Sequence, residues 1–207
     1  MNPNDHTPLR AVALVCTLSP SPSPSSSQLL AEQTMAALAE HGVTGKTIRI
    51  ADHDVKAGVK TDMGDGDAWP EIRDTILACD ILILSTPIWL GHPSSIAQRV
   101  LERLNAEISE TDDEGRMLTY GKVAAVCVVG NEDGAHKVSA DLFQGLNDVG
   151  FSLAPNAATY WVGEAMHGTD YQDLDKTPEK TAATTATLAA NTAHLARRLK
   201  AAPYPAS

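Results

Sequence analysis

The sequence has 207 residues and a formal net charge of −10, from 16 basic and 26 acidic side chains. This length suits one α/β domain with a sizeable core. Nucleic acids and anionic membranes are bound by clustered basic surfaces, so the acidic balance argues against both as partners. No apolar run reaches the roughly 18 residues of a membrane span, and residues 1–9 lack the apolar segment of a secretory signal. We therefore expect a cytoplasmic protein.

Neither the cysteines nor the acidic loop of the sequence predicts a metal site. Cys16, Cys79 and Cys127 are widely spaced, and we interpret them as buried small residues in a reducing compartment. The Asp- and Gly-rich residues 52–67 resemble a calcium loop that starts at Asp62. Its twelfth position, however, would be Arg73 instead of the Glu that an EF-hand requires. We expect a solvated surface loop.

The segment 10–41 predicts a strand, a polar bend and a helix. Ala11–Cys16 is a continuous apolar run, which is typical of a strand covered on both faces. Thr17–Ser27 then holds six serines and three prolines without any basic residue. Beyond this bend, apolar and small residues recur at helical spacing as far as Leu38. A helix that starts directly after a strand and a polar bend has the geometry of an anion site.

The serines of the bend supply chemistry that suits a phosphate. The first N–H groups of a helix have no internal partner, and the helix dipole places partial positive charge there. Ser25, Ser26 and Ser27 lie at the expected helix start, where one hydroxyl can cap the helix and the others can donate to a ligand. The three prolines stiffen the approach. A Ser/Pro run is otherwise typical of a flexible linker, but a linker would not interrupt a strand and its crossover helix.

The remaining elements alternate along the chain. We expect strands at 46–50, 80–86, 122–130 and 151–163, and helices at 69–78, 94–104, about 135–147 and 177–200, with Gly150 in a left-handed helix stop. Residues 107–120 predict an acidic surface loop or hairpin outside the core. Residues 1–9 and 201–207 predict disordered tails around one domain at 10–200.

Five apolar strands that alternate with helices predict an α/β fold with a parallel sheet wrapped on both faces. Ligands of such sheets bind outside the carboxyl ends of the strands, where the strand order reverses. The three long polar loops follow the first, third and fourth strands and would therefore lie at one edge. They contain the segments CTLSPSPSPSSS, STPIWLGHPSS and GNEDGAH.

With these three segments, the chain resembles the flavodoxin-like NAD(P)H-dependent FMN reductase and quinone reductase superfamily, particularly its iron-sulfur-flavoprotein-like branch, over nearly its whole length. The resemblance implies a three-layer sandwich with five parallel strands in the order 2-1-3-4-5, and FMN as the cofactor. The family loop ends in Ser-Asn-Thr where this chain has three serines, and the cluster cysteines of the branch are absent. An iron-sulfur centre is therefore not expected.

The resemblance also implies roles for residues of the three loops. In the first loop, serine hydroxyls would hold the FMN phosphate while two backbone groups contact it or the ribityl chain: Ser19, Ser21, Ser25, Ser26 and Ser27, with Thr17 and Leu18. In the second, the backbone would face the isoalloxazine, with a tryptophan that either stacks or serves packing: Pro87, Ile88, Trp89, Leu90 and Gly91. In the third, Asn131 and Glu132 would contact the flavin edge, and Gly130 and Gly134 would allow an unusual φ or a close approach to the cofactor. Asp133 would cap the following helix, and His136 would be a proton donor, a cap or a packing residue.

The expected function is hydride transfer from NAD(P)H through FMN to a small acceptor such as a quinone or free flavin. Two alternatives stay open: a flavodoxin that only carries electrons, and a site for a different phosphate ligand. The excursions at 52–67 and 107–120 suggest a covered pocket, which favours the enzyme. The resemblance further implies a homodimer or homotetramer, with Tyr160, Trp161 and Met166 as candidates for the subunit interface.

Overall fold

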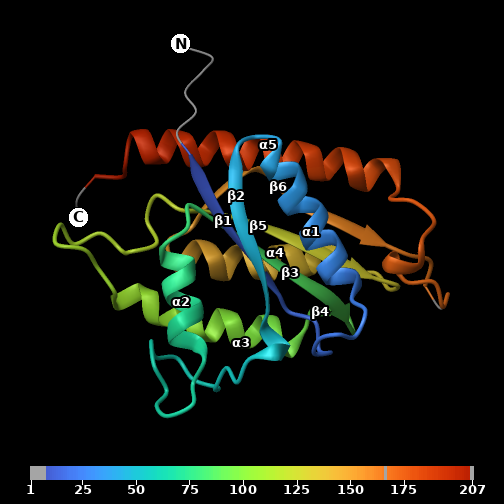
Figure 1. Cartoon of the computed structure of the whole chain (residues 1–207), viewed down its shortest axis with the longest axis horizontal. Coiled ribbons are helices and arrows are strands. Elements are labelled where there is room, and N and C mark those ends of the chain that lie inside the picture. Colours follow the sequence, from blue (N-terminus) through green and yellow to red (C-terminus); the bar gives the residue numbers. More distant parts are fainter. Residues whose placement is uncertain (1–7, 166, 206–207) are drawn as a thin grey trace.

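A computed structural model describes residues 8–165 and 167–205, and its centre is a parallel sheet between two layers of helices (Figure 1). The parallel strands run in the order β2-β1-β3-β5-β6, which confirms the predicted arrangement 2-1-3-4-5. A short strand, β4 (His92–Pro93), was not predicted and pairs antiparallel with the end of β3. The parallel strands are β1 (Leu9–Val15), β2 (Val43–Arg49), β3 (Ile81–Trp89), β5 (Val123–Gly130) and β6 (Ser152–Val162).

Two apolar cores lie on opposite faces of the sheet. Successive side chains of a strand point to opposite faces, so β1 gives Val12 and Leu14 to one core, and Ala11 and Ala13 to the other. The first core is closed by α2 (Trp69–Leu77), α3 (Ser95–Leu104) and α4 (Ala135–Asp148). The second is closed by α1 (Ser26–Ala39) and α5 (Glu179–Ala201). Double coverage explains why the strands are apolar runs instead of alternating sequences.

Some element bounds differ from the sequence prediction. β3 continues beyond residue 86 to Trp89, because its end pairs with both β5 and β4. The tails were predicted to be disordered, but β1 begins at Leu9, and residues 1–7 and 206–207 lie outside the described residues. Gly150 has φ of +96°, as expected for the stop after α4. None of the helices among the described residues is long and apolar enough to cross a membrane.

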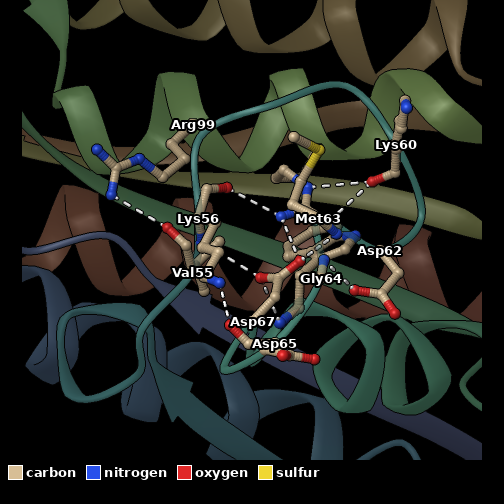
Figure 2. A network of polar contacts seen from close by, with 11 residues as sticks. Val55, Lys56, Lys60, Asp62, Met63, Gly64, Asp65, Asp67 and Arg99 are labelled. Atoms are coloured by element: carbon tan, nitrogen blue, oxygen red, sulfur yellow. Dashed lines mark hydrogen bonds and ion pairs between the residues drawn. The ribbon is translucent and has the colours of Figure 1, made fainter.

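The loop at 53–68 was predicted to be solvated, but a buried ion pair anchors it. Asp67 and Arg103 meet at 2.8 Å, and both side chains are fully buried. Asp67 also accepts hydrogen bonds from the backbone N–H groups of Met63 and Lys56 (Figure 2). Arg103 in turn donates to the Lys60 carbonyl and lies over the Trp69 ring. The acidic side chain therefore organises the loop from inside, without a metal-binding group of three or more ligands among the described residues.

The acidic excursion at 107–120, predicted as a surface loop or a hairpin, contains an antiparallel bridge between Thr111 and Met117. Its ends, however, are part of the packed structure. Glu107 is buried and paired with Arg73 at 2.6 Å, and the buried Thr119 hydroxyl donates to the Val149 carbonyl. The prediction that this segment lies outside the core is correct only for its tip.

Two carbonyls of the edge strand β6 are bonded to α5. The carbonyls of Pro155 and Tyr160 accept hydrogen bonds from Asn191 and Thr181 of that helix. The pairing of β6 with β5 shifts register between Ala124 and Val126, next to this proline.

Candidate functional site

A cavity of about 340 Å³ opens at the carboxyl ends of β1, β3 and β5, within the size range of ligand pockets. All three predicted loops reach it, as expected for parallel strands that end at one edge. The excursions at 52–67 and 107–120 contribute none of its lining residues, so they are not the cover that the sequence suggested. A fourth segment, between β6 and α5, takes that place.

The first loop lines one end of the cavity with the residues Thr17, Leu18, Ser19, Pro24, Ser25, Ser26 and Ser27. Ser25 is the N-cap of α1, and its hydroxyl accepts from the Gln28 N–H at 3.2 Å. The Leu29 N–H bonds to the Ser25 carbonyl. Within the described residues, the N–H groups of Ser26 and Ser27 have no acceptor, as is usual for a first helical turn.

The outer arc of this loop, residues 20–24, has no free backbone N–H donor. Pro20, Pro22 and Pro24 lack an N–H, and the Ser23 N–H bonds to the Pro20 carbonyl. Ser21, predicted to bind the cofactor, is not among the lining residues. Its N–H and hydroxyl both donate to Asp52, at 2.6 and 2.7 Å. Free backbone donors for an anion are therefore confined to the two ends of the loop, which face the cavity.

The second loop brings Pro87, Ile88 and Trp89 to the cavity but not Leu90 or Gly91. The chain turns away there, with φ of +52° at Leu90, whose side chain is 89% exposed. The Leu90 N–H donates to the Glu132 carboxylate at 2.8 Å. That bond ties the second loop to the third and uses an N–H that was expected to face the flavin.

The third loop brings Gly130, Asn131 and Glu132 to the cavity. Asp133, Gly134 and His136, which were also predicted as site residues, lie outside the lining. Gly134 itself is the N-cap of α4, without a side-chain cap, and within the described part of the chain Asp133 accepts from the Gly134 N–H alone. Asp133 is therefore not the predicted cap.

His136 is engaged outside the cavity. Its Nε2 lies 3.0 Å from the Tyr160 hydroxyl, and the two rings pack edge to face. Tyr160 likewise belongs to this pair and not to the lining. Met166, the third residue suggested for a subunit interface, lies outside the described residues.

The sequence prediction missed several lining residues: Pro24, Val129, Trp161, Asp170, Tyr171 and Gln172. Three of them come from the segment before α5, which is fastened over α1 and the third loop. The Gln172 N–H donates to the Ser26 hydroxyl, and Asn131 donates to Asp170. These contacts join distant parts of the chain, so no local pattern indicates them. Trp161 could have been predicted as a lining residue, because it lies at the carboxyl end of the last strand.

The electrostatics of the lining are unusual for an anion site. None of the described lining residues is Lys, Arg or His, and Glu132 and Asp170 contribute carboxylates. Burial raises the pKa of the Tyr171 phenol, so this hydroxyl stays protonated and donates to Gln33 at 2.6 Å. Two acceptors, Asn131 Oδ1 and Gln172 Oε1, are buried without a hydrogen-bond partner among the described residues. The cavity thus offers neutral donors at the serine end, and no basic side chain among its described lining residues.

Residues 10–167 match a family described as NADPH-dependent FMN reductase. The 8-demethyl-8-aminoriboflavin-5'-phosphate synthase of Streptomyces davaonensis is 35% identical over 206 residues, which are 95% of this chain and 80% of that protein. A protein of Mycobacterium bovis named divalent metal cation transporter MntH is 36% identical over 200 residues. That match spans 93% of this chain but 29% of the M. bovis protein.

Solved structures give the same fold. The crystal structure of RosB with the bound intermediate 8-demethyl-8-formylriboflavin-5'-phosphate has a TM-score of 0.85 and 35% identity, over 95% of this chain and 82% of RosB. An apo NADH:FMN oxidoreductase, EMOB, has a TM-score of 0.66 at 20% identity, over 91% and 88% of the two chains. An archaeal flavodoxin has a TM-score of 0.59 at 9% identity, over 91% and 99%. The last two likenesses concern the fold, which is flavodoxin-like.

Proposed function

This chain belongs to the NADPH-dependent FMN reductase family, and from this premise we propose that it passes hydride from NAD(P)H through FMN to a small acceptor, such as a quinone or a free flavin. An FMN-dependent enzyme of the oxidoreductase type follows from the family itself. The identity of the acceptor and the residues that hold FMN are the proposed part.

The cavity residues fit FMN. Neutral hydroxyls and the free amides of a helix start suit a phosphate, which the helix dipole also favours. Trp89 and Trp161 add flat apolar surface to the lining. The single observation that carries the proposal is the meeting of the α1 start with three serines at one end of this cavity.

Each loop has a distinct task in this proposal. Ser25, Ser26 and Ser27 would bind the phosphate, and Pro87 to Trp89 would lie along the ring. Glu132, held by the Leu90 N–H, would fix the spacing between the second and third loops. When bound, FMN supplies the hydride exchange between the nicotinamide and the acceptor. We assign no proton transfer to His136, because it is bonded to Tyr160 outside the lining.

A second candidate is supported by the relatives. The synthase of S. davaonensis and RosB are each 35% identical to this chain over 95% of its length, and their names refer to modified flavin phosphates. A chain this similar could take a flavin 5'-phosphate as the substrate that is changed, instead of as a resident cofactor. The same serine end would then hold the substrate phosphate.

The test is to mix the purified protein with FMN and NADPH without oxygen, and to record the visible absorbance of the flavin. Rapid bleaching, reversed by a quinone or by excess free flavin, supports the reductase. Mass spectrometry of the flavin recovered after aerobic incubation tests the second candidate, which predicts a changed mass. FMN binding with neither bleaching nor a mass change would instead support an electron carrier and contradict both proposals.

A further inference from the structure

Arg49 binds the first loop, residues 17–27, from outside the cavity. It is the last residue of β2 and is 9% exposed. Its Nη1 donates to the Ser23 carbonyl at 2.8 Å and to the Ser19 carbonyl at 3.5 Å. Its Nε donates to the Gln28 side chain, in the first turn of α1, at 2.7 Å. One guanidinium therefore joins Ser19 and Ser23 of the loop to the start of α1 at Gln28. Arg49 itself does not line the cavity.

Asp52 completes the attachment from the turn that follows β2. Its two carboxylate oxygens accept the N–H and the hydroxyl of Ser21. The bond from the Ser21 N–H is the main cause that lowers the pKa of this carboxyl, so Asp52 is charged at neutral pH. Asp52 thus accepts hydrogen bonds from donors of Ser21, whereas Arg49 donates to backbone carbonyls of the same loop.

The contacts of Arg49 determine which groups of the loop face the ligand. A carbonyl oxygen that points at a phosphate repels it, whereas an N–H or hydroxyl attracts it. The loop has few N–H groups because of its prolines, so its carbonyls are in excess. Arg49 engages two of these carbonyls outside the cavity, and the planar fork of its guanidinium suits several acceptors at fixed angles. The cavity end is left with hydroxyls and the first amides of α1.

We propose that Arg49 and Asp52 are positioning residues of the phosphate site, which set the orientation of the 19–25 loop without touching the ligand. This inference rests on the proposed function, in which the serine end takes the phosphate of a flavin. It predicts that the loss of Arg49 weakens binding through the phosphate group specifically. A purely structural role would weaken binding of phosphorylated and unphosphorylated flavins alike.

The experiment is a fluorescence titration of flavin-free protein with FMN and, in parallel, with riboflavin, which lacks the phosphate. For Arg49→Gln we expect FMN affinity to fall about tenfold to a hundredfold, the range for lost hydrogen bonds to a charged group. Riboflavin affinity should change little. Arg49→Lys keeps the charge without the fork and should recover part of the loss. Asp52→Asn should lower FMN affinity by less than Arg49→Gln, because Asp52 is exposed.

Arg73→Gln is the matched control, since Arg73 pairs with Glu107 and does not line the cavity. It should lower stability but keep the ratio of FMN to riboflavin affinity. If the wild type binds both flavins equally well, the proposed phosphate site is wrong. If the wild type prefers FMN and Arg49→Gln keeps the same ratio, the positioning role is wrong. If Arg49→Gln does not fold, the ratio for the exposed Asp52→Asn variant decides in the same way.

Discussion

Ser27 is the most buried serine of the first loop, with 2% of its surface exposed. Its carbonyl accepts from the Ser85 hydroxyl of β3 at 2.7 Å, which holds the residue at the cavity. We expect Ser27→Ala to lower FMN affinity by roughly five- to tenfold, the effect of one lost hydrogen bond, and to leave the rate of flavin reduction at saturating FMN nearly unchanged. Fluorescence titration and stopped-flow absorbance measure the two effects.

Ser139→Ala provides the control for this prediction. Ser139 is also a buried helical serine, but its hydroxyl donates to the Ala135 carbonyl within α4. Its replacement should leave FMN affinity at the wild-type value. Equal affinities of the Ser27 and Ser139 variants would remove Ser27 from the binding site.

Asp67 gives stability a defined pH dependence. Burial would raise the pKa of this carboxyl, but hydrogen bonds from Met63, Arg103, Trp69 and Lys56 outweigh it and lower the pKa to about 2. An unfolded aspartate titrates near 3.9. The ionised pair therefore contributes its full stability above about pH 4, and this stability is lost as the pH falls towards 2.

We expect the free energy of unfolding to fall in this pH window more steeply for the wild type than for Asp67→Asn. Urea denaturation from pH 2 to 7 measures the unfolding free energy of both proteins. The other carboxylates titrate in both, so their contribution cancels in the difference between the two curves. Parallel pH curves for the two proteins would show that Asp67 is not held ionised. At neutral pH the variant should already be less stable, because it leaves the buried Arg103 without its partner.

Single residues of the site could be predicted from the sequence where the backbone alone places them. Ser25, Ser26 and Ser27 follow from the start of a helix after a strand, and Trp89 follows from the end of β3. Ser21 has the same composition signal, yet it faces Asp52. Composition shows which residues can donate to a phosphate, but the direction of each hydroxyl depends on contacts such as those of Arg49.

At the scale of elements, the segment between β6 and α5 acts as the cover of the cavity. Its hold on α1 comes from the Tyr171 hydroxyl, which donates to Gln33, and from Gln33, which donates to Thr177. We expect Tyr171→Phe to lower the free energy of unfolding by about 1 kcal/mol and to weaken FMN binding, because a looser segment orders only at a cost. Limited proteolysis should then cut within residues 163–178 faster, and FMN should slow that cleavage. Unchanged cleavage rates would contradict the covering role.

The order of the strands and helices was predictable because each element carries its own periodicity. The apolar runs, the glycine after α4 and the proline in α2 are local signals. The cover was assigned to residues 52–67 and 107–120 because long polar excursions are often found over active sites. Their actual anchors, Arg103 and Arg73, are contributed by helices distant in sequence. Such pairings depend on how α2 and α3 pack, which no window of the sequence contains.

For the whole molecule, FMN should act as a stabilising ligand. A ligand at a hundred times its dissociation constant stabilises the folded state by about 2.7 kcal/mol, which is about 5 to 10 °C in Tm for a chain of this size. Differential scanning fluorimetry with increasing FMN checks this value. In the proposed function NADPH reacts with bound FMN, so NADPH alone should shift Tm much less. A shift that is equal for FMN and NADPH would contradict this order of binding.

The bonds between β6 and α5 affect self-association of the chain. An open sheet edge recruits strands from other molecules, which leads to domain swapping or fibrils. Here Pro155 offers no N–H, and the carbonyls of Pro155 and Tyr160 are already bonded to α5. A second copy could extend the sheet at these positions only after that helix was displaced. At these positions of β6, partial unfolding of the last helix would therefore be the step that exposes a template for aggregation.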